Sequence, residues 1–145
     1  MDNIIYELNL LPGDRIVVPK SDLRVVQHHA LYLGKNHQGV SLIAENKIGF
    51  GVRLVSLEEF FSTAIEITRI ERFQGTSHDR KMAILMVLNK LGKPYNLINY
   101  NCQHFANEIQ HGKIRSEQVD NFVAGLKAAA GVFIFFSIIN TIFND

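Results

Sequence analysis

The sequence has only one cysteine, Cys102, and almost no excess of charge of one sign. A single cysteine excludes an internal disulfide, and a zinc site would have to consist of histidines and carboxylates alone. Because 15 lysines and arginines face 14 aspartates and glutamates, no basic surplus is left to neutralise a run of phosphates. We therefore expect no nucleic-acid partner, metal or cofactor. Residues 1–11 lack the basic and apolar pattern of a secretory signal, so we expect the protein to meet a reducing cytosol.

Apolar residues are concentrated in the C-terminal part of the sequence. Hydrophobic residues make up 47% of the chain, but they account for 16 of the 24 residues from Phe122 to Asp145. The stretch from Ala128 to Phe143 contains no charge. A helix needs roughly 20 apolar residues to cross the hydrocarbon core of a bilayer. Residues 122–143 are long enough for this if the Lys127 side chain snorkels to the interface. A buried core helix is the alternative interpretation.

The charges around this segment suggest an orientation. Lys113, Arg115 and Lys127 lie before or at its start, whereas only Asp145 lies beyond it. Basic residues favour the cytoplasmic side of a membrane. We therefore expect residues 122–145 to form a membrane anchor and the rest of the chain to face the cytoplasm.

Strand patterns dominate the first half of the chain and helix patterns the second half. Short alternating or β-branched segments between turn residues predict strands over residues 15–18, 28–33, 40–44, 52–55 and 65–70. Helical spacing predicts helices over 57–62, 79–91 and 101–110. Ser56 with Glu59 fits a capping box, and Asn101 is the expected N-cap of the last helix, which ends at Gly112. This order predicts an α+β fold in which an antiparallel sheet packs on helices.

Cys102 lies in the first turn of the last predicted helix, where free N–H groups and the helix dipole stabilise a thiolate. A free cysteine is more often a small buried hydrophobic residue, so a nucleophile needs a base nearby. His28 and His29 are neighbours on a predicted strand and face opposite sides of the sheet. At most one of them can face the thiol, and the alternation pattern leaves the choice open. His104 is about 200° around the helix from Cys102, so we interpret it as structural.

Several motifs occur together in the order expected of one family. They are Pro12-Gly13-Asp14, His28-x-Ala30-x-Tyr32-x-Gly34, Pro94-Tyr95-Asn96-Leu97, and Asn101-Cys102-x-His104-Phe105-x-Asn107-Glu108. In this combination the chain resembles the lecithin:retinol acyltransferase family, which includes the HRAS-like suppressor phospholipase/acyltransferases. The resemblance covers roughly residues 10–112, and the segment around Cys102 is its most specific part. It implies a circularly permuted papain-like fold.

The resemblance also implies a mechanism and a set of catalytic residues. A cysteine of this family takes an acyl group from a lipid ester as a thioester and passes it to an amine, an alcohol or water. Alignment from Gly34 places the base at His28 rather than His29. The residue that orients the base is usually a histidine on the next strand, but this stretch has none. We expect Glu45 in that role and Asn46 as the second choice, since either can accept a hydrogen bond from an imidazole N–H and hold its tautomer.

The sequence therefore predicts a catalytic domain over residues 1–121 and a hydrophobic segment over 122–145. We expect a cysteine-dependent acyltransferase or phospholipase with a phospholipid or other lipid as acyl donor. Tyr95 and Tyr100 are close to the thiol in sequence, and we expect them to pack rather than to line an acyl site. Two alternatives stay open. One is a papain-like peptidase or amidase with the same residues, and the other is a non-catalytic membrane adaptor.

Overall fold

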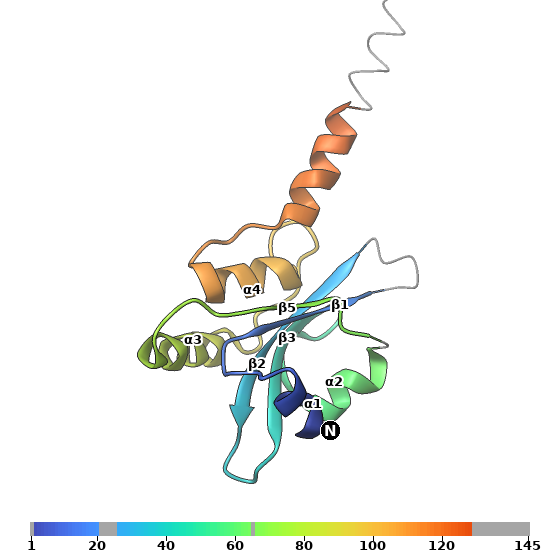
Figure 1. Cartoon of the computed structure of the whole chain (residues 1–145). Coiled ribbons are helices and arrows are strands. Elements are labelled where there is room, and N and C mark those ends of the chain that lie inside the picture. The colour runs from blue at the N-terminus through green and yellow to red at the C-terminus, as the bar shows by residue number, and fades with distance from the viewer. Residues whose placement is uncertain (1, 21–25, 65, 129–145) are drawn as a thin grey trace, which may run out of the picture. The chain divides into compact units, whose positions relative to one another are not determined.

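The computed structural model describes residues 2–20, 26–64 and 66–128. The chain divides into two compact units, residues 1–115 and 116–145. The described residues of the first unit form four helices and five strands, which Figure 1 shows. In chain order they are α1 (Asp2–Glu7), β1 (Arg15–Pro19), β2 (Gln27–Lys35), β3 (Ser41–Lys47), β4 (Gly51–Ser56), α2 (Leu57–Thr63), β5 (Arg69–Glu71), α3 (Ser77–Lys90) and α4 (Cys102–His111).

The five strands form one sheet in the order β4-β3-β2-β1-β5, and every neighbouring pair is antiparallel. Because side chains alternate along a strand, the sheet has two apolar faces. Leu31 and Ala44 face a cluster that includes residues of α3 and α4. Ala30 and Ile43 face a second cluster that includes residues of α2. This arrangement confirms the predicted α+β architecture with an antiparallel sheet and helices.

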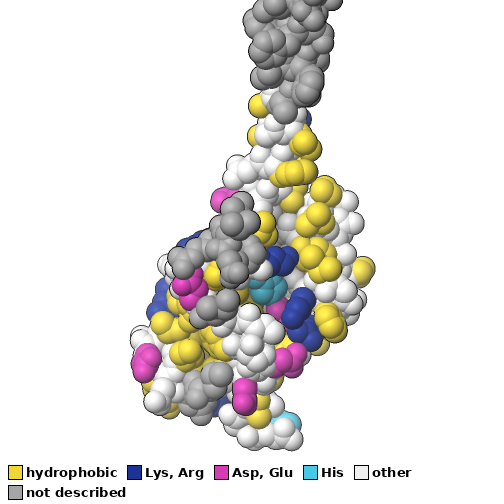
Figure 2. Space-filling view, turned by 90° about the vertical axis from the view of Figure 1, so that its right-hand side faces the viewer, with side chains coloured by type: hydrophobic (Ala, Val, Ile, Leu, Met, Phe, Trp, Pro, Cys, Tyr) yellow, Lys and Arg dark blue, Asp and Glu magenta, His cyan; other side chains and the backbone are white. Residues whose placement is uncertain are grey.

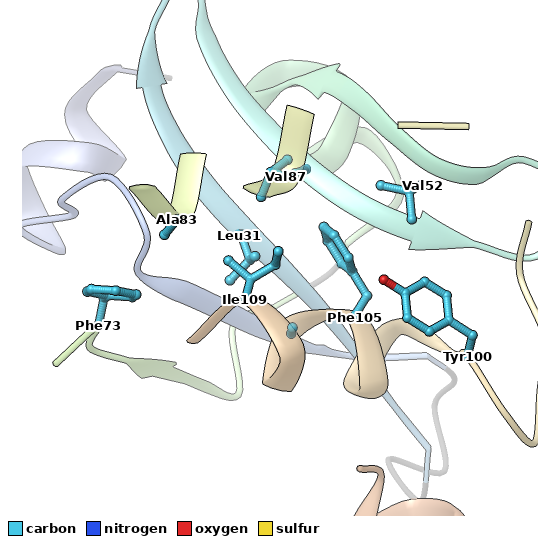
Figure 3. Packing of buried hydrophobic residues seen from close by; sticks show 10 residues of the cluster. Leu31, Val52, Phe73, Ala83, Val87, Tyr100, Phe105 and Ile109 are labelled. Atoms are coloured by element: carbon cyan, nitrogen blue, oxygen red, sulfur yellow. The ribbon is translucent and has the colours of Figure 1, made fainter. Parts of the chain in front are cut away.

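Helix α4 is held against the sheet by the first cluster. Phe105 and Ile109 are buried and lie on the same face of α4, since they are four residues apart. Figure 3 shows Ile109 beside Leu31 of β2, while the ring of Phe105 points toward the strands. Val87 of α3 completes this contact from a third element. The packing fixes the position of α4, and with it the position of Cys102 at its first turn.

The first four predicted strands and the three predicted helices are confirmed, with shifted ends. Strand β3 runs on to Lys47, three residues beyond the expected end. Ser56 caps α2 as predicted, because its side chain accepts a hydrogen bond from the Glu59 N–H. Helix α3 begins at Ser77 rather than residue 79, since Thr76 is the N-cap and Asp79 bonds back to it.

Two elements differ from the prediction. The strand expected over 65–70 is wrong in extent, because β5 comprises only Arg69–Glu71, which pairs with residues 15–17 of β1. The alternation of isoleucines in this segment was misleading. Ile67 and Ile70 do pack against the second cluster, but only Ile70 does so from within the strand. Helix α1 was not expected from the sequence.

The Pro-Gly-Asp motif has a structural role. Asp14 is fully buried, and its carboxylate accepts hydrogen bonds from the N–H groups of Leu11 and Phe73. It also pairs with Arg72 and Arg80 at 2.7 and 2.9 Å. Burial raises the pKa of Asp14, but the bonds from the two arginines and the backbone outweigh it and lower the pKa below its usual value. The motif therefore joins the turn before β1 to the segment that leads into α3.

In the second unit, residues 117–128 are helical, and Ser116 Oγ accepts a hydrogen bond from the Val119 N–H at 3.4 Å. Among the residues that the structure describes, no helix is long and apolar enough to cross a bilayer. Of the predicted anchor over residues 122–145, the structure describes residues 122–128. Residues 129–145 lie outside the described residues.

Candidate active site

The first turn of α4 is built by Asn101 and His104. The Asn101 side-chain oxygen accepts hydrogen bonds from the N–H groups of Gln103 and His104 at 3.0 and 3.1 Å. The His104 ring Nδ1 in turn accepts a hydrogen bond from the Asn101 N–H at 3.2 Å. His104 thus takes part in a capping box, in agreement with its structural interpretation. The Asn101 side chain does not accept from the N–H of Cys102. This N–H belongs to the first turn, whose donors have no partner within the helix.

Cys102 joins the start of α4 to the start of β2. Its side chain is 2% exposed, and its Sγ donates to the carbonyl oxygen of Gln27 at 3.7 Å. The imidazole of His28, the next residue of β2, interacts with the thiol closely enough for each group to change the pKa of the other. The structure therefore brings together two residues that are 74 positions apart in the sequence, 28 and 102.

The His28 imidazole is held from its other side by Glu45 of β3. Its Nε2 lies 2.7 Å from Glu45 Oε2, and both side chains are almost fully buried. The ring also stacks on Phe60 of α2, with 6.1 Å between the centroids. The Nδ1 atom is buried and has no hydrogen-bond partner among the described residues. Because Glu45 engages Nε2, Nδ1 is the ring nitrogen available to the thiol.

The electrostatics of His28 and Cys102 favour an ion pair. Burial lowers the pKa of His28, but the Cys102 thiol and the Glu45 carboxylate outweigh it and raise the pKa to about 9. Burial raises the pKa of Cys102, and His28, the His29 N–H and Lys20 together bring it below its usual value. These two shifts favour a thiolate beside an imidazolium over the neutral pair. This pairing is the activated form of a cysteine nucleophile.

The other candidates from the sequence lie elsewhere. His29 is 1% exposed, and burial together with the charges of Arg15 and Arg69 lowers its pKa to about 3. It is therefore neutral and does not form the ion pair with the thiol. The Asn46 side chain donates to the carbonyl oxygen of Tyr100 at 2.7 Å, away from His28. Of the two residues expected to orient the base, Glu45 is the one that contacts it.

Arg53 of β4 was not expected at this site from the sequence. Its Nε and a terminal nitrogen donate to Glu45 Oε1 at 2.9 and 2.6 Å, so the two oxygens of this carboxylate serve different partners. Arg53 also pairs with Glu59 of α2 at 3.1 Å. Glu45 and Arg53 are directly opposite each other in the β3–β4 register. Opposite charges at paired positions of a predicted hairpin are the signal that could have revealed this contact.

A cavity of about 190 Å³ opens beside His28 and Glu45. Its apolar walls come from β1, from α2 and from the C-cap of α2, and the residues are Val18, Pro19, Phe60 and Ala64. Two lysines, Lys20 and Lys47, also line it. On the face shown in Figure 2, basic side chains lie close to a histidine and to hydrophobic groups. Within the described part of the chain, no group of three or more histidines, cysteines and carboxylates is arranged to hold a metal ion.

Comparison with known proteins places this geometry in context. The model of a family described as permuted papain-like amidase enzymes (YaeF/YiiX, C92 family) matches residues 15–119. Phospholipase A and acyltransferase 5 of Mus musculus is 45% identical over 47 residues, which are 32% of this chain and 17% of that protein. The protein of the same name from Rattus norvegicus is also 45% identical over 47 residues, 16% of its length. The chain thus matches less than a fifth of these relatives, and the family resemblance predicted from the motifs is confirmed.

Proposed function

The chain belongs to the permuted papain-like amidase family, and on this premise we propose that it transfers acyl groups through a thioester on Cys102. The family description names amidases, and the two relatives are named as a phospholipase and acyltransferase. Both indicate an enzyme. The observation that carries the proposal is the buried arrangement of Cys102, His28 and Glu45, in which the pKa of the thiol is lowered and that of the imidazole is raised. Cys102 is the nucleophile, His28 the acid and base, and Glu45 the residue that orients His28.

In the first half of the reaction, the Cys102 thiolate attacks the carbonyl carbon of the acyl donor. A C–S bond forms, and the N–H of Cys102 at the start of α4 stabilises the negative charge on the carbonyl oxygen. The bond between the carbonyl carbon and the leaving oxygen then breaks. The His28 imidazolium gives its Nδ1 proton to that oxygen, so the alcohol leaves and a neutral imidazole remains beside the thioester.

In the second half, the acceptor restores the enzyme. Water, an alcohol or an amine gives a proton to Nδ1 of His28 and attacks the thioester carbonyl. The C–S bond breaks, and the products are the acylated acceptor, a thiolate and an imidazolium. Glu45 keeps its hydrogen bond to Nε2 throughout, which holds the ring in the orientation and tautomer that both halves require.

A lipid ester is the acyl donor that we propose. The names of the two relatives describe phospholipase and acyltransferase activity. The cavity beside His28 supports the same substrate class, because its apolar walls suit part of an acyl chain and Lys20 and Lys47 suit an anionic head group.

The proposal is tested by trapping the acyl-enzyme. Full-length protein is mixed with a phospholipid, quenched in acid, and digested for mass spectrometry. We expect one fatty acyl group on the peptide that contains Cys102, and no acylation in Cys102→Ala. The exposed-loop variant His37→Gln is the matched control and should acylate like the wild type. Equal release of fatty acid by the wild type and Cys102→Ala would overturn the proposal.

An amide is the alternative acyl donor, and the description of the family favours it. The same thioester forms, but the leaving group is an amine that must receive a proton from His28 before it can depart. Paired ester and amide substrates with the same acyl chain separate the two. A lipid acyl hydrolase should favour the ester, whereas an amidase should retain a comparable kcat/KM on the amide.

We also propose that the segment 122–145 attaches the enzyme to a membrane, with the catalytic unit on the cytoplasmic side. Its support is the uncharged run from Ala128 to Phe143 and the basic residues before it. Carbonate extraction of membranes from expressing cells tests the attachment. Full-length protein should remain in the pellet, and its quantitative release into the supernatant would contradict the proposal.

A further inference from the structure

Four large apolar side chains are exposed on two neighbouring turns of the first unit. Ile48 and Phe50 lie in the turn between β3 and β4, and they are 57% and 63% exposed. Leu97 and Ile98 lie in the segment before α4, and they are 62% and 47% exposed. Single exposed apolar residues are ordinary on a protein surface, but a group of them marks a site of interaction.

The backbone brings these two turns together. Gly92 donates from its N–H to the Val52 carbonyl oxygen at 2.8 Å, and Val52 donates to the carbonyl oxygen of Lys93 at 2.9 Å. The segment after α3 therefore pairs with the start of β4. At Gly51 the approach is so close that a Cβ would lie 2.5 Å from the Lys93 oxygen. The turn with Phe50 and the segment that leads to Leu97 are thus fixed side by side.

The same surface borders the candidate active site. The Asn101 side chain, next to Cys102, donates to the carbonyl oxygen of Leu97 at 3.1 Å. The Lys20 ammonium lies 5.5 Å from the centre of the Tyr95 ring, and Lys20 also lines the cavity beside His28. The exposed apolar turns therefore lie at the end of the sheet where the thiol and the imidazole meet.

Lysines lie beside these two turns. The Lys47 ammonium lies 5.9 Å from the Phe50 ring centre, and the Lys93 ammonium lies over the ring of Tyr100. Lys20, which lies near Tyr95 and lines the cavity together with Lys47, is exposed as well. Arg53 adds little net charge here, because Glu45 and Glu59 pair with it. Apolar tips among lysines have the chemistry of a surface that inserts into lipid head groups and attracts anionic lipid.

We propose that Ile48, Phe50, Leu97 and Ile98, with Lys20, Lys47 and Lys93, form a docking surface for an anionic lipid bilayer. The inference rests on the proposed function, because the docking surface explains how a lipid ester reaches Cys102. It does not depend on the C-terminal segment, because the surface lies entirely within the first unit. A bilayer held here presents its lipids directly to the cavity.

The absence of tryptophan from the sequence provides a position-specific test. Leu97→Trp introduces one fluorophore on the proposed surface. Val40→Trp is the matched control, because Val40 is 40% exposed and precedes β3 at the end of the β2–β3 hairpin opposite His28 and Glu45 (Figure 1). Both variants are made in the full-length chain with Cys102→Ala. Binding is then measured without catalysis, so that a failure of the proposed mechanism does not affect the result.

The variants are titrated with vesicles of phosphatidylserine in phosphatidylcholine, with or without brominated lipid as a quencher. We expect the emission of Leu97→Trp to move to shorter wavelength and to be quenched by the brominated lipid, while Val40→Trp changes little. Adding Lys93→Gln should weaken the vesicle partition about fivefold. Phe50→Trp provides a second reporter in case Leu97→Trp folds poorly. No change at either reporter, or an equal change at Val40→Trp, would overturn the proposal. An equal response to vesicles of phosphatidylcholine alone would refute the role of the lysines.

Discussion

Two adjacent histidines on β2 have opposite acid–base behaviour. Side chains alternate between the faces of a strand, so His28 meets the thiol and the Glu45 carboxylate while His29 meets the charges of Arg15 and Arg69. The pKa of His28 rises to about 9, and that of His29 falls to about 3. A single step along the backbone thus separates an imidazolium from a permanently neutral imidazole at physiological pH.

We predict that Glu45→Gln reduces kcat/KM roughly 100-fold and moves the alkaline limb of its pH profile to lower pH. The active form has a protonated His28, and the carboxylate helps to hold the pKa of His28 near 9. The glutamine amide keeps the shape of the Glu45 side chain but removes its negative charge, so the pKa of His28 should fall. Rates measured from pH 5 to 10 with a water-soluble ester provide the test.

The position of the alkaline limb in the pH profile distinguishes a role of Glu45 in orienting His28 from a role in packing alone. A variant that merely disturbs the fold lowers the rate at every pH and leaves the limb where it was. That outcome for Glu45→Gln would contradict the assignment of Glu45 as the orienting residue. Thermal unfolding of the same preparations serves as the control for folding.

The role of a residue could be predicted from the sequence only where its neighbours in sequence restrict its position. Cys102 is fixed at a helix start by Asn101, and this follows from capping preferences alone. The choice of His28 over His29 required the family resemblance, because strand periodicity is symmetric between the two faces. Glu45 and Asn46 are neighbours on β3, so their side chains lie on opposite faces of the sheet. Only the structure shows that Glu45 is on the face of His28.

Among the elements, β3 and β4 together fix the carboxylate that orients His28. Glu45 lies opposite Arg53 in their register, and Arg53 extends the contact to Glu59 of α2. Strand β4 thus acts on the proposed catalytic histidine, His28, without contacting it, because a carboxylate with one oxygen held by Arg53 can present only the other to His28.

We predict that Arg53→Met lowers kcat by roughly ten- to hundredfold with little change in KM. Arg53→Lys should recover part of the loss, since an ammonium restores charge but not the two-nitrogen contact. Glu59→Gln is the matched control, because it removes only the outer contact of Arg53. The measurement is steady-state kinetics on all three variants. A loss in Glu59→Gln as large as in Arg53→Met would show that the effect comes from α2 rather than from Glu45.

Register explains why this element-level feature escaped prediction. Glycine-rich turns after residues 34 and 47 were visible in the sequence, but their lengths did not define which residues of the hairpins pair. The bulge between Tyr32 and Gly34 shifts the β2–β3 pairing further. The short β5 has a similar cause, since only its pairing with β1, and not its composition, decides where it begins.

For the whole molecule, buried neutral His29 predicts a dependence of stability on pH. The unfolded chain binds a proton at this residue below about pH 6.5, whereas the folded protein does so only near pH 3. The stabilising contribution is therefore complete above pH 6.5 and is lost as the pH falls toward 3. Its limiting slope is about 1.4 kcal/mol per pH unit.

Urea unfolding of wild type and His29→Gln between pH 5 and 6.5 measures this contribution as the difference between the two slopes. Other groups whose protonation changes in this pH range affect both proteins and cancel in the difference. His37→Gln, in the exposed turn after β2, should keep the slope of the wild type. Equal slopes for wild type and His29→Gln would contradict the prediction.

The two edges of the sheet affect how copies of the protein meet one another. Strand β5, at one edge, is only three residues long. At the other edge, the pairing of Val52 with Gly92 and Lys93 already occupies backbone groups of β4 that a neighbouring strand would need. Long unpaired edges promote strand-to-strand aggregation. On the proposed lipid surface, copies of the protein would collide often, and these short or covered edges would limit strand-to-strand polymerisation.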